Sequence, residues 1–192
     1  MRYRTCKHNN HIRTAYLVFE ICRTLCKHLT FTSVSKKQFP DLANEIKRLN
    51  KQLNKNDIYL KILCECENRV LLFVYRSRQL CKYLLQNDIH ALLASYGYGE
   101  CKSVKQYILK LKSRLKMSEF PHEIGAFLGY PAHDIHGFIN HKDSGCLLVG
   151  EWRVYEDAEG AVHLFDKYKR CRNAVLRRID QGKTLAQIFC AA

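Results

Sequence analysis

The sequence predicts an α+β fold in which a small, mainly antiparallel sheet of about four strands is packed with amphipathic helices. In several long segments, apolar residues recur every three or four positions, as in helices that bury one face. Two other segments, 58–64 and 70–75, have the alternating and the continuous apolar patterns of strands. Because helices and strands are interspersed and at least one hairpin is expected, we predict one mixed layer fold.

The first half of the chain is expected to hold two helices and the hairpin. The helices cover residues 12–29 and 36–53, each with one apolar face. Residues 54–57 end the second helix. Segments 58–64 and 70–75 then form the two arms of the hairpin, and the second arm is the more central one.

The second half of the chain is expected to be mostly helical. Helices are predicted over 77–86, 88–95, 103–116 and 158–179. The glycines of "YGYGE" end the second of these helices, and Gly182 ends the last. Residues 147–155 have the composition of a strand, and a short turn of helix is expected at 184–189.

We expect two parts in the chain, an N-terminal helical segment, 1–32, and a single α+β domain, 33–192. With 192 residues, of which 47% are apolar, the chain is large enough for such a core. The apolar stretch Ala15–Ile21 is short and is broken by Glu20, so no secretory signal is expected. The longest apolar run, Val70–Tyr75, is too short to span a membrane, and we predict a cytoplasmic location without a membrane partner.

The ten cysteines are expected to be free thiols, since no export signal and no C-x-x-C pair is present. A structural zinc site is therefore not expected. His133, His136 and His141, followed by Cys146, are ligand-type side chains, and the first two would share a helix face. Solvated histidines on a helix surface are the better interpretation, and we predict no metal site.

The formal charge of +14, from 32 Lys and Arg against 18 Asp and Glu, favours anionic partners. One hypothesis is nucleic-acid binding through the basic outer faces of the helices within 36–55, 103–116 and 167–178. The alternative is a basic surface that has no specific partner. No known nucleic-acid-binding signature accompanies the charge.

The segment "EFPHEIGAFLGYPAHDIHGFINH", residues 119–141, is the main candidate for a functional site. Pro121 suits the start of a strand, in which His122 and Glu123 would point to opposite faces. This geometry weakens an acid–base pair, and "HEIG" lacks the second histidine of a zinc-protease motif. At Gly129, Tyr130 and Pro131 the strand is expected to turn into a helix, whose first turn can attract an anion.

The glycines of this segment suggest a recess. In the predicted strand, Gly125 and Gly129 share a face with Glu123 and Phe127. Gly150 and Trp152 share a face of the later strand. If these faces meet, a flat ligand can lie between Phe127 and Trp152. The alternative is that the glycines only allow close packing of a helix or bulge. The candidate ligand-binding residues are Glu123, Gly125, Phe127, Gly129, Tyr130 and Trp152.

The favoured hypothesis is a non-catalytic intracellular binding module for a small anionic or aromatic ligand, such as a nucleotide, and nucleic-acid binding is the alternative. An enzyme with His122 or Glu123 as acid or base and Tyr130 as proton donor ranks last, because only residue types support it. We find no catalytic motif and no signal that identifies a cofactor.

The chain also resembles a known family. The stretches "FPHEIGAFLGYPAHDIHGFI", "GEWRVYED", "LFDKYKRC" and "GKTLAQI" are similar to the bacterial family known as domain of unknown function 3793. The run from "IYLKIL" through "VLLFVYRSRQL" to "YGY" fits the middle of that family. The resemblance covers roughly residues 33–190. Residues 1–32 are atypical for the family, and the resemblance implies no activity.

Overall fold

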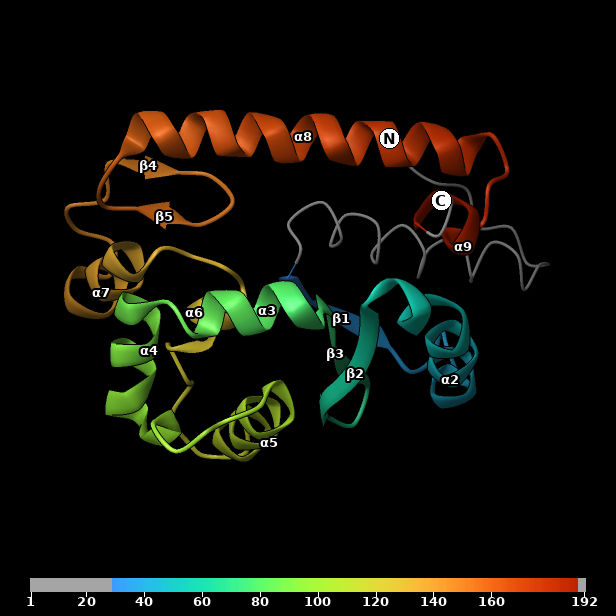
Figure 1. Ribbon diagram of the computed structural model, residues 1–192, viewed down its shortest axis with the longest axis horizontal. Coiled ribbons are helices and arrows are strands. Elements are labelled where there is room, and N and C mark those ends of the chain that lie inside the picture. Colours follow the sequence, from blue (N-terminus) through green and yellow to red (C-terminus); the bar gives the residue numbers. More distant parts are fainter. Residues whose placement is uncertain (1–28, 190–192) are drawn as a thin grey trace.

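The computed structural model describes residues 29–189 and contains a three-stranded antiparallel sheet (Figure 1). Its strands are β1 (Leu29–Ser35), β2 (Ile58–Glu65) and β3 (Arg69–Arg76). β3 lies in the centre, between β1 and β2, as its continuous apolar run predicted. β1 was not expected from the sequence. The proposed boundary at residue 32 falls inside this strand, and almost all of the helix expected at 12–29 lies outside the described residues.

The side chains of β3 alternate between two hydrophobic cores. Val70, Leu72 and Val74 point to one side of the sheet, where they pack with α2 (Leu42–Leu53) and α9 (Leu185–Phe189). Because helices cover both faces of the central strand, residues that point to either face are apolar. The alternation of β3 side chains is therefore not visible as an alternation of polar and apolar residues in the sequence. The sheet is therefore the middle layer between two groups of helices.

The second core lies on the other side of the sheet, against Phe73 and Tyr75 of β3. Five helices contribute to it: α3 (Ser77–Leu84), α4 (Asn87–Leu93), α5 (Val104–Arg114), α6 (Ile124–Phe127) and α7 (Ala132–His141). A π-helical turn, Ala94–Tyr98, follows α4 and buries Tyr98 completely in this core. Figure 1 shows these helices gathered at one end of the molecule, at the opposite end from α2.

A small hairpin and a long helix complete the fold. The hairpin consists of β4 (Leu148–Val149) and β5 (Arg153–Val154), and α8 (Ala158–Asp180) follows it. The single strand expected at 147–155 is wrong because the chain reverses in the middle, where Gly150 N–H donates to the Trp152 carbonyl over 3.0 Å. Figure 1 shows α8 along one edge of the molecule, from the hairpin at one end to α9 at the other.

The predicted α+β class is confirmed, and so are the hairpin 58–75 and the helices after it at 77–86, 88–95, 103–116, 158–179 and 184–189. The helix expected over 36–53 begins later, at Leu42, because Ser35 accepts hydrogen bonds from Gln38 and Phe39 in a preceding turn. Within the part of the chain that the structure describes, no helix is long and apolar enough to cross a membrane.

Candidate functional site

The segment around Pro121 forms a helical corner and not the strand that its alternation suggested. Ile124 N–H donates to the Pro121 carbonyl over 3.0 Å, and α6 follows. The helix then ends in a Schellman motif, in which Tyr130 N–H donates to Gly125 and Gly129 N–H to Ala126. The sequence contained a signal for this helix end. Ile124 and Phe127 have an apolar i, i+3 spacing, and Gly129 and the pair Tyr130-Pro131 that follow them are typical of the end of a helix.

Two predicted site residues, Glu123 and Phe127, lie in the interior of the second core. Glu123 is 0% exposed and pairs with Arg114, with Nε 2.5 Å from Oε1. Tyr98 also donates to Glu123 over 3.3 Å. Phe127 packs against the ring of Tyr98, with the centroids 5.7 Å apart. Both side chains therefore hold α6 against the core and do not line the cavity described below.

The Glu123 network changes the acid–base behaviour of its partners. The hydrogen bond from Arg114 to Glu123 raises the pKa of the guanidinium. Burial, and then the charge of Glu123, raise the pKa of the Tyr98 phenol. His122, next in sequence to Glu123, is exposed at the surface. The two side chains therefore lie in different environments, and the separation expected from strand geometry arises instead from a helical corner.

A cavity of about 170 Å³, partly open to solvent, lies between α6, α7 and the β4–β5 hairpin. Most of its wall is apolar or aromatic. The lining side chains are Phe120, His122, Ile124, Tyr130, Asp134, Ile135, Phe138, Trp152 and Arg153, together with Gly125. Of the six predicted site residues, the structure brings Gly125, Tyr130 and Trp152 together in this wall.

Trp152 and Tyr130 form a stacked pair, with ring centroids 5.0 Å apart and planes inclined at 30°. Two hydrogen bonds locate the Tyr130 residue, because Tyr83 donates to its carbonyl and its own hydroxyl donates to the Glu151 carbonyl over 3.4 Å. Burial raises the pKa of Tyr130 to about 12, so the phenol is neutral near pH 7. The pair thus presents a fixed aromatic surface to the cavity.

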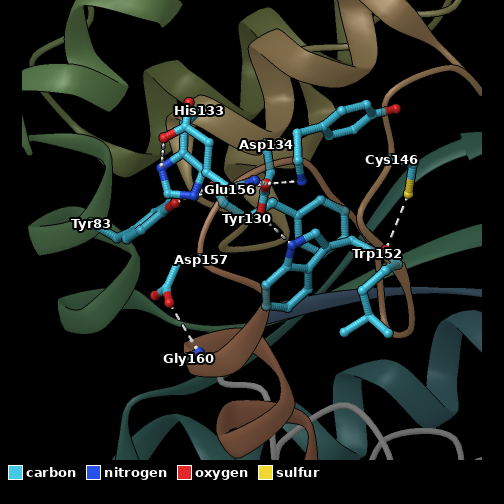
Figure 2. Close-up of polar contacts among 11 residues, drawn as sticks. Tyr83, Tyr130, His133, Asp134, Cys146, Trp152, Glu156, Asp157 and Gly160 are labelled. Atoms are coloured by element: carbon cyan, nitrogen blue, oxygen red, sulfur yellow. Dashed lines mark hydrogen bonds and ion pairs between the residues drawn. The ribbon is translucent and has the colours of Figure 1, made fainter.

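Asp134 positions Trp152 and was not among the residues predicted from the sequence. Figure 2 shows the indole nitrogen of Trp152 directed at Asp134, and the Nε1 to Oδ2 distance is 2.7 Å. The other oxygen, Oδ1, accepts the backbone N–H of Tyr155 over 2.7 Å and that of Glu156 over 3.3 Å. Asp134 is only 3% exposed, and both of its carboxylate oxygens accept hydrogen bonds from the hairpin segment. Its partners lie about twenty residues away in sequence, and no local pattern identified them.

The glycines have different structural roles. At Gly150, an added Cβ would lie 2.2 Å from the ring of Phe165, so this glycine allows α8 to pack on the hairpin. Gly129 has φ = 75° and ends α6. At Gly125, an added Cβ would lie 3.0 Å from Ile135. Close packing, which was the alternative interpretation, therefore accounts for Gly150, and a helix end accounts for Gly129.

Two side chains with N–H donors, Arg153 and His122, lie in the lining of the cavity. Arg153 pairs with Asp143 at the surface, with Nη2 2.7 Å from Oδ1. His122 lies between two rings, with its centroid 5.9 Å from that of Phe120 and 5.5 Å from that of Phe138. An imidazole and a guanidinium can both donate hydrogen bonds to an anion.

The other histidines considered for a metal site lie elsewhere. His133 is near Asp134 and Glu156, with nitrogen–oxygen distances of 3.7 and 4.0 Å. His136 and His141 are exposed, and Cys146 donates to the Leu148 carbonyl. Among residues 29–189, no three His, Cys, Asp or Glu side chains are grouped as metal ligands.

Comparison with known proteins gives a family and no further relatives. No curated protein and no solved structure matches the chain. One family model, described as "Protein of unknown function (DUF3793)", matches residues 10–189. The match includes the corner at 120–131, the hairpin and α8, and it begins within the segment 1–32 that the sequence analysis had set apart. The chain therefore belongs to the DUF3793 family of proteins of unknown function.

Proposed function

We propose that this protein is a non-catalytic binding module for a small aromatic ligand that carries an anionic group. The observation that supports this proposal is the cavity between α6, α7 and the hairpin, which has a volume of about 170 Å³ and aromatic walls. An apolar cavity of about 150 Å³ is large enough to bind benzene. The cavity therefore has room for one aromatic ring, while the rest of the ligand would lie at the open side.

The walls favour a flat, apolar group. Trp152 is fixed by Asp134 and stacked on Tyr130, so both rings keep their orientation when the cavity is empty. Phe120 and Phe138 supply further ring surfaces. Aromatic pairs contribute about 0.5–1.5 kcal/mol beyond the area that they bury, and preorganised rings lose little entropy on binding.

The rim favours a negative charge. Arg153 and His122 both line the cavity, and the chain has a formal charge of +14. A positive field raises the association rate of anions, and the rim groups supply local donors. A carboxylate or a phosphate on the ring would meet these donors, which is why nucleotides are among the ligands considered.

The polar groups near the cavity support binding more than catalysis. Asp134 accepts three hydrogen bonds from the hairpin, and Glu123 pairs with Arg114 inside the core. The hydroxyl of Tyr130 donates to a backbone carbonyl, and burial raises its pKa. These three groups are engaged in holding the walls, which leaves His122 as the exposed imidazole of the lining.

Isothermal titration calorimetry tests the proposal with benzoate and AMP as probes and with their neutral counterparts, benzamide and adenosine. We expect the anionic member of each pair to bind more tightly. Phe120→Ala removes a ring that is 62% exposed, so it spares the fold, and should weaken binding roughly two- to tenfold. The matched control, Leu109→Ala, removes an exposed apolar side chain from α5 and should change nothing.

Arg153→Gln tests the charge preference separately. We expect it to lower the affinity for the anionic probes by up to about fivefold, because exposed ion pairs contribute at most about 1 kcal/mol. The affinity for the neutral probes should stay the same. Absence of binding by all four probes, or equal losses from Phe120→Ala and Leu109→Ala, would contradict the proposal.

A further inference from the structure

The outer face of α8 carries a row of basic side chains that the cavity does not use. Between residues 167 and 183 the chain has seven basic residues and one acidic residue, Asp180. The basic residues are Lys167, Lys169, Arg170, Arg172, Arg177, Arg178 and Lys183. Arg172 differs from the others because it points inward and pairs with Glu151, with Nη2 2.6 Å from Oε1.

Four of these residues form one stripe on the helix. At 100° per residue, Lys167, Arg170, Arg177 and Arg178 fall within one sector of about 100°. All four are exposed. We call them the α8 stripe. No ion pair joins them to any other residue in the part of the chain that the structure describes.

The stripe faces away from the rest of the molecule. The opposite side of α8 carries Leu164, Phe165 and Tyr168, which pack on the hairpin, and Val175 and Ile179, which pack against the first core. Figure 1 shows α8 along the outer edge of the molecule. The stripe is therefore a straight, accessible row of charges about 16 Å long, at 1.5 Å per residue.

The helix dipole explains only part of this pattern. Arg177 and Arg178 lie in the last turn of α8, where cations are favoured by the negative end of the helix. Lys167 and Arg170 lie in the middle of the helix, where this effect is absent. Ala174 lies between the two pairs, is exposed and has a short side chain, so the surface along the stripe is even.

We propose that the α8 stripe binds the phosphate backbone of a nucleic-acid duplex without sequence preference. Along a duplex, each strand carries one phosphate per about 3.4 Å of axis, so 16 Å of helix passes roughly five phosphates of one strand. Single strands are bound with the help of aromatic side chains that stack on bases. No exposed aromatic side chain lies on the described residues of α8, which favours a duplex over a single strand.

The proposal concerns one of the three basic surfaces suggested by the sequence, and residues of the other two serve for comparison. On α5, Arg114 is engaged by the buried Glu123 and is not available to a phosphate. On α2, Arg48 pairs with Glu45, which leaves Lys47 and Lys51 as exposed cations of the helix. These two lysines serve as the matched control, because their removal changes the net charge as much as removal of two stripe residues.

Fluorescence anisotropy with a DNA duplex of roughly 20 base pairs, about two helical turns, tests the proposal between about 50 and 200 mM salt. With four phosphate contacts, the logarithm of the affinity should fall with the logarithm of salt with a slope of about −3.6. The double substitution Lys167→Gln and Arg170→Gln should bring the slope to about −2 and weaken binding to all sequences alike. Lys47→Gln with Lys51→Gln should leave the slope unchanged.

Three outcomes would overturn the proposal. The first is that no duplex binding is detected at about 50 mM salt. The others are an equal loss of duplex affinity in the stripe variant and the α2 control, and a higher affinity for a single strand than for the duplex. All substituted residues are exposed, and a far-ultraviolet circular dichroism spectrum identical to wild type would show that the fold is intact. The cavity is on different elements, so failure of this proposal leaves the small-ligand proposal standing.

Discussion

Replacing Asp134 by asparagine should loosen the β4–β5 hairpin and the wall of the cavity that it carries. The carboxylate accepts hydrogen bonds at both oxygens, from Trp152 Nε1 at one and from the backbone N–H of Tyr155 and Glu156 at the other. An asparagine amide has one oxygen and one NH₂ group, so one of these positions becomes a donor that faces a donor.

The asparagine can be oriented in two ways. The smaller loss of stability occurs when its amide oxygen accepts from the two backbone N–H groups, so that only the hydrogen bond to Trp152 is lost. Loss of one hydrogen bond to a buried charged group costs about 1.5–3 kcal/mol. For a chain of this length, that corresponds to a fall in Tm of roughly 3–12 °C. Because Trp152 is the chain's single tryptophan, its fluorescence reports the hairpin directly, and its emission should shift to longer wavelength.

Asp143→Asn is the matched control for this experiment. Asp143 also bonds the hairpin, through Arg153, but its side chain is 80% exposed and such pairs contribute at most about 1 kcal/mol. Thermal denaturation followed by circular dichroism, with the Trp152 emission spectrum in parallel, measures both variants. If Asp134→Asn matches wild type in Tm and in emission, the account of how Trp152 is held is refuted.

Further predictions concern the packing of the hairpin, the buried ion pair and alkaline pH. Gly150→Ala places a methyl group against Phe165 and should destabilise the protein by about 1–3 kcal/mol in urea denaturation; an unchanged midpoint would contradict the close contact. Arg114→Ala removes the ion-pair partner of the buried Glu123 and should cost about 3–5 kcal/mol, whereas a loss below about 1 kcal/mol would mean that the pair is solvated. Since the pKa of Tyr130 is raised from 10 to about 12, the unfolded state releases its proton first, so the free energy of unfolding should fall as pH rises from about 10 to 12. A free energy of unfolding that stays constant over this interval would contradict the buried position of Tyr130.

The sequence predicted those elements whose pattern is local. The helices α5 and α8 and the hairpin 58–75 have long, regular apolar periods, and the structure confirms each of them. β1 was missed because the alternation of residues 29–35 is broken at Thr32 and Ser33, which are both polar, and because the segment adjoins one with helical spacing. It becomes a strand by pairing with β3, about forty residues away, and a local pattern does not report such a partner.

The candidate site shows the same limit. Gly125, Tyr130 and Trp152 were predicted to lie together and do line one cavity, although the first strand assumed in that argument is a helical corner and the second is a short hairpin. Glu123 and Phe127 were placed on the same face by a period of two, but the segment is helical and turns both side chains into the core. Asp134 was not predicted because its role depends on Trp152, eighteen residues later, and no short-range rule joins the two.

The most direct test of the small-ligand proposal is the fluorescence of Trp152 during a titration with benzoate or AMP. The chain has a single tryptophan, and its indole forms part of the cavity wall beside Tyr130, so any signal arises at the site itself. We expect a saturable change in emission with the anionic probes, weakened by Phe120→Ala and unaffected by Leu109→Ala. An emission spectrum that stays constant while calorimetry detects binding would place the ligand elsewhere and contradict the account.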